Sequence, residues 1–144
     1  MAAPGSSDIL VDELFATTQR LQAYVNSRLR VHGASVARLR ALRMLASSPE
    51  PLRMRDLSEM LGVAARTTTA LVDSLERDGL VERVRHPADR RAFLVSLTPP
   101  GRIRHAEAEE VDRQALAAAT GRLGPAERAR LRELLAEIRG AVTE

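Results

Sequence analysis

The 144-residue chain contains no cysteine and no lysine, and only 2% of its residues are aromatic. The absence of cysteine excludes disulfide bonds, thiolate zinc sites, cysteine nucleophiles and regulation by thiol oxidation. No apolar run approaches the ~18 residues that a membrane-spanning helix needs. Residues 1–8 also lack the basic and apolar stretches of a signal peptide. We therefore expect a cytoplasmic protein.

The composition is that of one globular domain, alone or with an oligomerisation arm, because 44% of the residues are apolar and 28% are charged. All 22 basic residues are arginines, an excess that a GC-rich genome explains, and the net charge is only +3. Residues 81–104 hold six arginines and two acidic residues, a net charge of +4. Such a basic stripe is typical of a nucleic-acid contact, although many charged stretches only cover a solvated surface.

Apolar residues at helical spacing predict four helices in the first 80 residues of the chain. The first helix spans residues 8–30, and the second begins after Ser35, a suitable N-cap, and ends near residue 46. A short helix is predicted at residues 54–61, where Gly62 closes it, and another at 65–77, where Asp78-Gly79 ends it. The apolar face of the helix at 65–77 consists of Thr68, Leu71, Val72 and Leu75.

The period changes to that of β-strands between residues 80 and 97. Residues 80–85 and 92–97 are predicted to form a hairpin around the turn at 86–89. Thr98 is placed to cap a helix that continues to about residue 119, and Pro125 opens a last helix that extends to residue 142. The sequence therefore predicts a mainly α (α+β) protein with one β-hairpin.

The order helix, short helix, helix and hairpin over residues 35–97 predicts a winged helix-turn-helix. In this DNA-binding module the second helix of the helix-turn-helix pair enters the major groove. Its outward face should carry short polar side chains and arginine, which can pair with base edges or phosphates. The candidate DNA contacts on this face are Arg66, Thr67, Thr69, Ala70 and Ser74.

Three segments carry a recognisable pattern: DSLERDGLVER at 73–83, HPADRRA at 86–92 and VSLTPPG at 95–101. The Asp-x-Arg step followed by Leu-Thr-x-x-Gly is similar to the wing of the multiple-antibiotic-resistance regulator (MarR) family. The flanking helices also match that family in number and order. This resemblance implies a bacterial or archaeal transcriptional regulator that binds DNA as a homodimer, with residues 65–75 as its recognition helix.

The resemblance also implies roles for single residues of the wing. Arg91 would reach into the minor groove, and Asp89 would orient it through a salt bridge. A guanidinium suits a narrow, electronegative minor groove. We add Arg85 and Arg90 as further wing contacts. Two positions depart from the family pattern, since Ala64 replaces a capping Ser or Thr and Ala70 replaces a frequent arginine.

The flanking helices predict an interface between two copies of the chain. Residues 8–30 and 102–142 hold three amphipathic helices, more apolar surface than one small DNA-binding module can bury, unless they only extend the core of a monomer. We therefore expect one MarR-type domain over residues 8–142, with the winged module at 35–97, dimerisation helices on both sides and a flexible tail at 1–7. A two-fold dimer would place two recognition helices about 10 bp apart on a pseudo-palindromic operator.

The resemblance implies an effector site as well, because inducers of the family are often aromatic anions or lipophilic compounds bound between the DNA-reading module and the dimer helices. Arginine or histidine can hold a carboxylate while tyrosine and leucine cover a ring. The alternative is that these side chains are ordinary packing and surface groups. The candidates, from the first, second and fifth helices, are Tyr24, Arg28, His32, Arg38, Leu42 and His105.

The sequence shows no catalytic constellation, no phosphate-binding glycine loop and no metal-ligand spacing, so we expect no enzyme activity and no cofactor. The interpretation is a DNA-binding transcriptional regulator, in the first place a repressor, that a small molecule releases from its operator. One alternative is a winged-helix interaction module whose basic wing meets an acidic partner protein. The other is a constitutive DNA binder without an effector.

Overall fold

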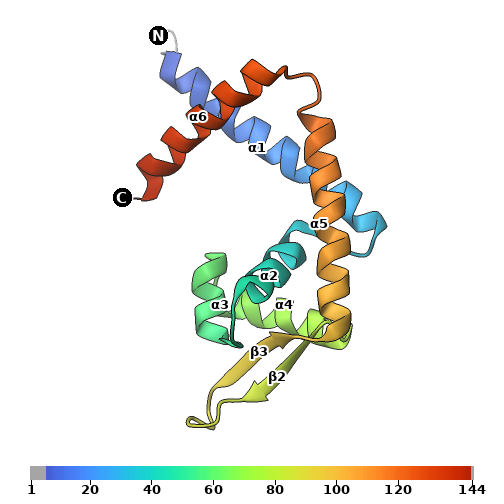
Figure 1. The fold of residues 1–144 in the computed structure, drawn as a ribbon. Helices are drawn as coiled ribbons and strands as arrows, with labels where there is room; N and C mark the ends of the chain where they lie inside the picture. Colours follow the sequence, from blue (N-terminus) through green and yellow to red (C-terminus); the bar gives the residue numbers. More distant parts are fainter. Residues whose placement is uncertain (1–5, 144) are drawn as a thin grey trace.

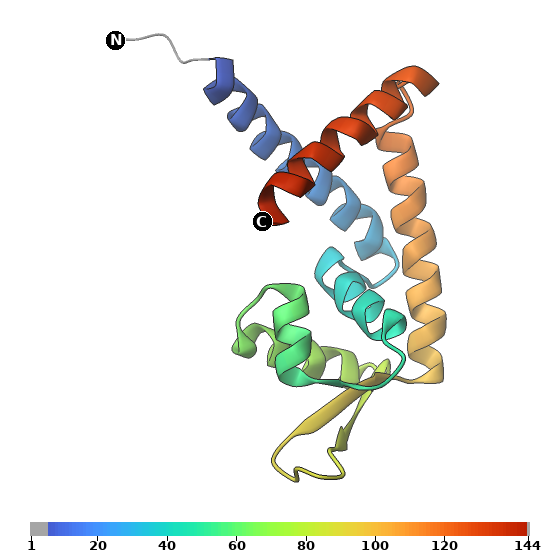
Figure 2. The same cartoon turned by 60° about the vertical axis from the view of Figure 1, so that its left-hand side comes forward.

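A computed structural model describes the backbone of residues 6–143 and the side chains of residues 9–143. Within this range the chain forms a winged unit at one end and a pair of crossing helices, α1 and α6, at the other (Figure 1). Helix α5 runs along the molecule from the wing to the loop before α6, as Figure 2 shows from another side. The elements are α1 (Ser6–Val31), α2 (Val36–Ser47), β1 (Leu52–Arg53), α3 (Met54–Leu61), α4 (Ala65–Arg77), β2 (Val81–Arg85), β3 (Phe93–Leu97), α5 (Pro99–Ala119) and α6 (Pro125–Thr143).

Two apolar clusters hold α1–α5 and the sheet together, and both include α2. The larger cluster lies inside the winged unit, where α2, α3, α4 and the sheet meet; its most buried members include Leu42, Leu57, Val72, Leu75 and Val95. The smaller cluster lies where α1, α2 and α5 meet; it consists of Val25, Leu29, Leu39, Ala108 and Ala115. Leu39 and Leu42 lie in different clusters, so α2 is packed on two sides.

The helix ends lie where the sequence predicts them. The Ser35 hydroxyl accepts a hydrogen bond from the backbone N–H of Arg38 at 3.1 Å, which caps α2. Gly62 ends α3 with a φ of 68°, and Gly79 follows α4 with a φ of 73°, a backbone region that glycine adopts without strain. Ala64 gives α4 no side-chain cap, as expected from its departure from the family pattern. The mainly helical, winged fold is thus confirmed.

Two details differ from the expectation. The hairpin belongs to a three-stranded antiparallel sheet of order β1-β3-β2, because the two-residue strand β1 pairs with β3 through Leu52–Val95 and Arg53–Leu94. Two residues are too few to produce the alternation by which a strand is recognised in a sequence. Helix α1 begins at Ser6, inside the expected tail, and residues 1–5 of that tail lie outside the described residues. Helix α5 begins at Pro99, directly after its cap Thr98, as the sequence predicts.

Gly101 marks the closest approach between α5 and the winged unit. A Cβ atom at this position would lie 1.9 Å from the carbonyl oxygen of Leu80. The neighbouring Thr98 fixes the same contact, since its hydroxyl accepts from the N–H of Gly101 at 3.1 Å and donates to the carbonyl of Gly79 at 2.6 Å. The Leu-Thr-x-x-Gly pattern therefore has a packing reason: threonine caps α5, and glycine lets it touch the turn after α4.

We predict that Gly101→Ala lowers the free energy of unfolding by about 1–3 kcal/mol, because the new methyl group meets backbone that cannot move aside. The measurement is urea denaturation at a fixed protein concentration. Gly140→Ala is the matched control: a Cβ there meets nothing within 4 Å, and alanine favours a helix interior. Equal midpoints for Gly101→Ala and the unchanged protein would contradict the packing argument.

Candidate nucleic-acid interface

Helix α4 presents the polar face that the sequence assigns to DNA. Arg66, Thr67, Thr69 and Ala70 are exposed, whereas Thr68, Val72 and Leu75 are fully buried. The buried Thr68 hydroxyl accepts a hydrogen bond of 2.8 Å from Ser58 on α3, which ties the two helices of the helix-turn-helix together. The sequence analysis missed this bond; the signal that could have found it is a threonine in an otherwise apolar set.

Ser74 does not share this exposed face, which corrects one sequence assignment. Its hydroxyl accepts a hydrogen bond of 2.7 Å from Arg38 on α2, and the same guanidinium pairs with Asp78 at 2.6 Å. Ser74 is partly buried as a result. Two residues that the sequence placed in different sites, Ser74 and Arg38, thus form one link between α2 and the C-terminal end of α4.

The wing carries exposed arginines on both sides of its turn. Arg85, Arg90 and Arg91 are all exposed, and the guanidinium of Arg85 lies 5.7 Å from the centre of the Phe93 ring. Arg83 behaves differently, since it forms an ion pair with Asp73 on α4. That pair joins β2 to α4, so the position of the wing relative to α4 is held by a charge contact as well as by packing.

Asp89 supports the wing turn through the backbone, whereas the sequence analysis expected a salt bridge. Its Oδ1 accepts a hydrogen bond of 3.1 Å from the backbone N–H of Arg91. In the described part of the chain no ion pair joins it to the Arg91 guanidinium. A carboxylate two residues before an N–H closes a local turn in this way. Arg91 therefore projects from a turn that Asp89 shapes, and its own side chain is free to meet a ligand.

The candidate effector residues separate into three places. Tyr24, Arg28 and His32 line a cleft of about 200 Å³ between α1 and α5, together with Val111 and Ala115. Arg38 lies at the link to Ser74, and Leu42 is 2% exposed in the core of the winged unit. His105 belongs to a charge network between α2 and α5. The cleft is therefore built by two helices, α1 and α5. The sequence analysis expected α2 to line it as well, and α2 does not.

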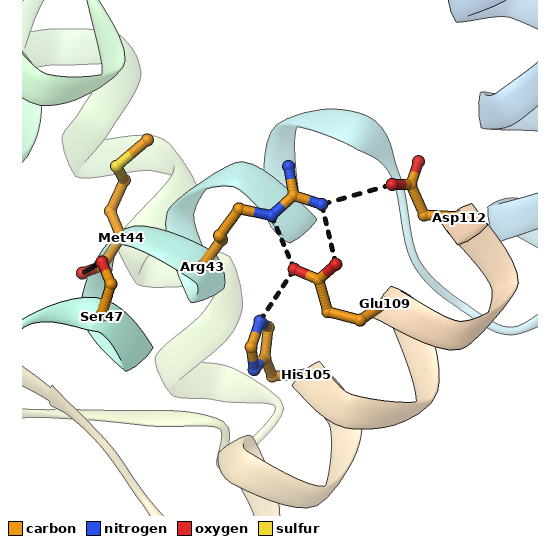
Figure 3. Close-up of polar contacts among 6 residues, drawn as sticks. All are labelled: Arg43, Met44, Ser47, His105, Glu109 and Asp112. Carbon is orange, nitrogen blue, oxygen red and sulfur yellow. Dashed lines mark hydrogen bonds and ion pairs between the residues drawn. The ribbon is translucent and has the colours of Figure 1, made fainter. Parts of the chain in front are cut away.

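The charge network joins α2 to α5 (Figure 3). Arg43 donates two hydrogen bonds to Glu109, at 2.6 and 2.9 Å, and one to Asp112 at 3.3 Å; His105 lies 3.0 Å from the same Glu109 carboxylate. The bond from Arg43 lowers the pKa of Glu109, partial burial opposes this, and the bond with His105 reinforces it. Because this pKa is lowered in the fold, the network stabilises the protein at pH values above the usual glutamate pKa. That contribution is lost as the pH falls through the lowered pKa.

Helices α1 and α6 leave large apolar side chains exposed. Leu10 and Phe15 of α1 are 65% and 66% exposed, and α6 buries none of its residues. The two helices cross at the end of the molecule away from the wing (Figures 1 and 2). The exposed apolar residues on α6 are Leu131, Leu134, Leu135, Ile138 and Val142.

No cluster of three or more histidine and acidic side chains within residues 9–143 is arranged to hold a metal ion. None of the described helices combines the length and the apolar character that crossing a membrane requires.

The helix pair α3–α4, the sheet and its arginine-bearing hairpin define a winged helix-turn-helix protein. A model of the MarR family matches residues 32–92. The homoprotocatechuate degradative operon repressor of Escherichia coli is 29% identical over 94 residues, which cover 65% of this chain and 63% of that protein. The first curated relatives match over only about a third of their own length, at 32% and 34%.

Solved structures extend the likeness to nearly the whole chain. The transcriptional regulator BldR from Sulfolobus solfataricus is 27% identical with a TM-score of 0.81, over 99% of both chains. CouR from Rhodococcus jostii, solved with p-coumaroyl-CoA bound, is 25% identical with a TM-score of 0.76, over 94% of this chain and 95% of that one. The family model and these structures support the resemblance to MarR-family regulators that the wing motif predicts.

Proposed function

We propose that the protein is a sequence-specific DNA-binding transcriptional regulator that acts as a repressor. The observation that carries this proposal is the exposed Arg66–Thr67–Thr69 face of α4 beside a wing with three exposed arginines. Short polar side chains suit base edges in the major groove, and arginine suits the minor groove. That the E. coli relative is an operon repressor supports the negative sign of regulation.

We expect Arg91→Ala to weaken binding to the DNA upstream of the protein's own gene by about 1–3 kcal/mol, the value of one good arginine contact. Asp89→Ala should weaken binding less, because it removes only the acceptor that shapes the turn. The measurement is a gel-shift titration at physiological salt. Arg122→Ala, in the loop between α5 and α6 at the far end from the wing, is the control (Figure 1). Unchanged affinity of Arg91→Ala would refute the assignment.

We further propose that the protein acts as a homodimer, with a two-fold interface built from α1 and α6. The exposed apolar residues of these helices support this, since monomers rarely present such contiguous apolar surface to water. A two-fold arrangement would also present two recognition helices to the two halves of a pseudo-palindromic operator.

Analytical ultracentrifugation at micromolar concentration should show a dimer of the full chain. Removal of residues 125–144 should give monomeric or insoluble protein, because it takes away the apolar face of α6 and uncovers that of α1. A full-length chain that sediments as a stable monomer would contradict the proposed interface.

The cleft between α1 and α5 is the proposed effector site, with an aromatic carboxylate as its ligand. Arg28 lies over the Tyr24 ring, with its guanidinium 5.3 Å from the ring centre, and His32 lines the same cleft. This set offers the Arg28 guanidinium and the His32 ring as hydrogen-bond donors for a carboxylate, and an apolar wall for a ring. Among solved relatives, CouR binds p-coumaroyl-CoA and 6-hydroxynicotinic acid regulates the DNA binding of BpsR from Bordetella bronchiseptica.

We predict that salicylate raises the melting temperature of the protein and weakens its DNA complex, and that Arg28→Met reduces both effects. Arg30→Met is the matched control, because Arg30 is an exposed arginine of the same helix that does not line the cleft. A panel of aromatic carboxylates that changes neither property would favour a constitutive DNA binder.

A further inference from the structure

The wing contains a histidine whose two ring nitrogens are both in use. The backbone N–H groups of Ala88 and Asp89 point at Nδ1 of His86, at 3.0 and 3.1 Å. Because Nδ1 accepts from both, it carries a lone pair and no proton. The single proton of the neutral ring therefore lies on Nε2, which makes Nε2 a hydrogen-bond donor.

Nε2 of His86 meets a second donor. It lies 3.2 Å from Nη2 of Arg53, and a guanidinium has only N–H groups to offer. The opposite tautomer would satisfy Arg53, but it would turn an N–H toward two backbone N–H groups in a tight turn, where neither can move. Two donors thus converge on one point with no acceptor between them, and an oxygen atom placed there would satisfy both.

The surroundings of this point are cationic. Arg53 belongs to β1, and its guanidinium reaches the end of β2 across β3, where Ala92 presents only a methyl group. A depression of about 300 Å³ adjoins it and is lined by Arg53, Met54, Arg55, Arg91, Ala92 and Phe93. No acidic residue lines it, and within residues 9–143 Arg53, Arg55 and Arg91 form no ion pairs. The depression also contains Arg91, the proposed minor-groove contact.

We propose that Arg53 and His86 bind one phosphate group of the DNA backbone at the base of the wing, with Arg55 contributing charge. The inference rests on the proposed DNA-binding function and adds a site to it. A phosphate supplies several strong acceptor oxygens, so one group can take the Nε2–H and the guanidinium N–H together. Such a contact holds the wing in register on the duplex and carries no sequence information.

The test compares two variants that remove one donor each. In His86→Asn the side-chain oxygen can still accept from the backbone N–H groups of Ala88 and Asp89, which keeps the turn. The Nε2–H donor of the histidine ring is lost. In Arg53→Met the aliphatic stem stays and the charge goes. Arg122→Met, in the loop between α5 and α6, is the control for loss of a remote arginine. The probe is a random-sequence duplex, because a phosphate contact acts on every sequence alike.

Arg53→Met should weaken duplex binding about 5- to 10-fold and reduce the slope of log K against log salt by about 1, as expected for one lost charge contact. His86→Asn should weaken binding about 3-fold without changing that slope, because it removes a hydrogen-bond donor and leaves the Arg53 charge in place. The double variant should bind at most about 2-fold more weakly than Arg53→Met, since both donors hold one phosphate. Nitrogen NMR of the free protein should show the proton of His86 on Nε2.

Several results would overturn the proposal. They are a proton on Nδ1, a His86→Asn slope reduced as much as that of Arg53→Met, fully additive losses in the double variant, or variants that bind like Arg122→Met. Saturable binding of inorganic phosphate at His86 without DNA would assign the site to a small phosphate ligand instead. If the unchanged protein binds no duplex at all, the proposed DNA-binding function itself fails. That outcome is seen without any variant, so it is distinguished from failure of the phosphate site.

Discussion

The packing of α2 on both of its sides is the constraint from which the rest of the arrangement follows. Leu39 anchors the helix among α1 and α5, and Leu42 anchors it in the winged unit. Each of its three arginines contacts a different helix. Arg38 binds Ser74 and Asp78 around the end of α4, and Arg40 donates to the carbonyl of Leu61 at the end of α3. Arg43 binds Glu109 on α5. One 12-residue helix therefore joins the helix-turn-helix pair α3–α4 to α1 and α5.

This arrangement suggests how a ligand could act on DNA binding from a distance. The cleft between α1 and α5 is lined by Ala115, which belongs to the same small cluster as Leu39 of α2, and by Tyr24, which packs against that cluster. A ligand there would touch no proposed DNA contact. It could change DNA affinity only by binding one packing of α1 and α5 around α2 better than another, since an effector shifts an equilibrium by its differential affinity for the two states.

The arginines of the chain fall into two groups by what they contact. Arg38, Arg43 and Arg83 each have a carboxylate partner on another element and act as ties within the fold. Those assigned to DNA, on the exposed face of α4 and around the wing, form no ion pair within residues 9–143. The overall charge of +3 is therefore a weaker guide to the binding surface than the placement of the acidic residues. A guanidinium already paired to a carboxylate has little left to gain from a phosphate.

Local signals in the sequence determined the helix ends and the hairpin, and they carry the resemblance to the MarR family. Ser35, Gly62, Gly79 and Thr98 act on backbone within a few residues of themselves, so their effect can be predicted without knowing the fold. The tertiary structure alone decided which distant side chains meet: Arg38 with Ser74, 36 residues apart, and Arg53 with His86, 33 apart. It also decided that Tyr24, Arg28 and His32 share a cleft from which Leu42 and His105 are excluded. Periodicity gives the face of a helix on which a residue lies, but the partner of that face depends on how the helices pack, and no local pattern encodes that.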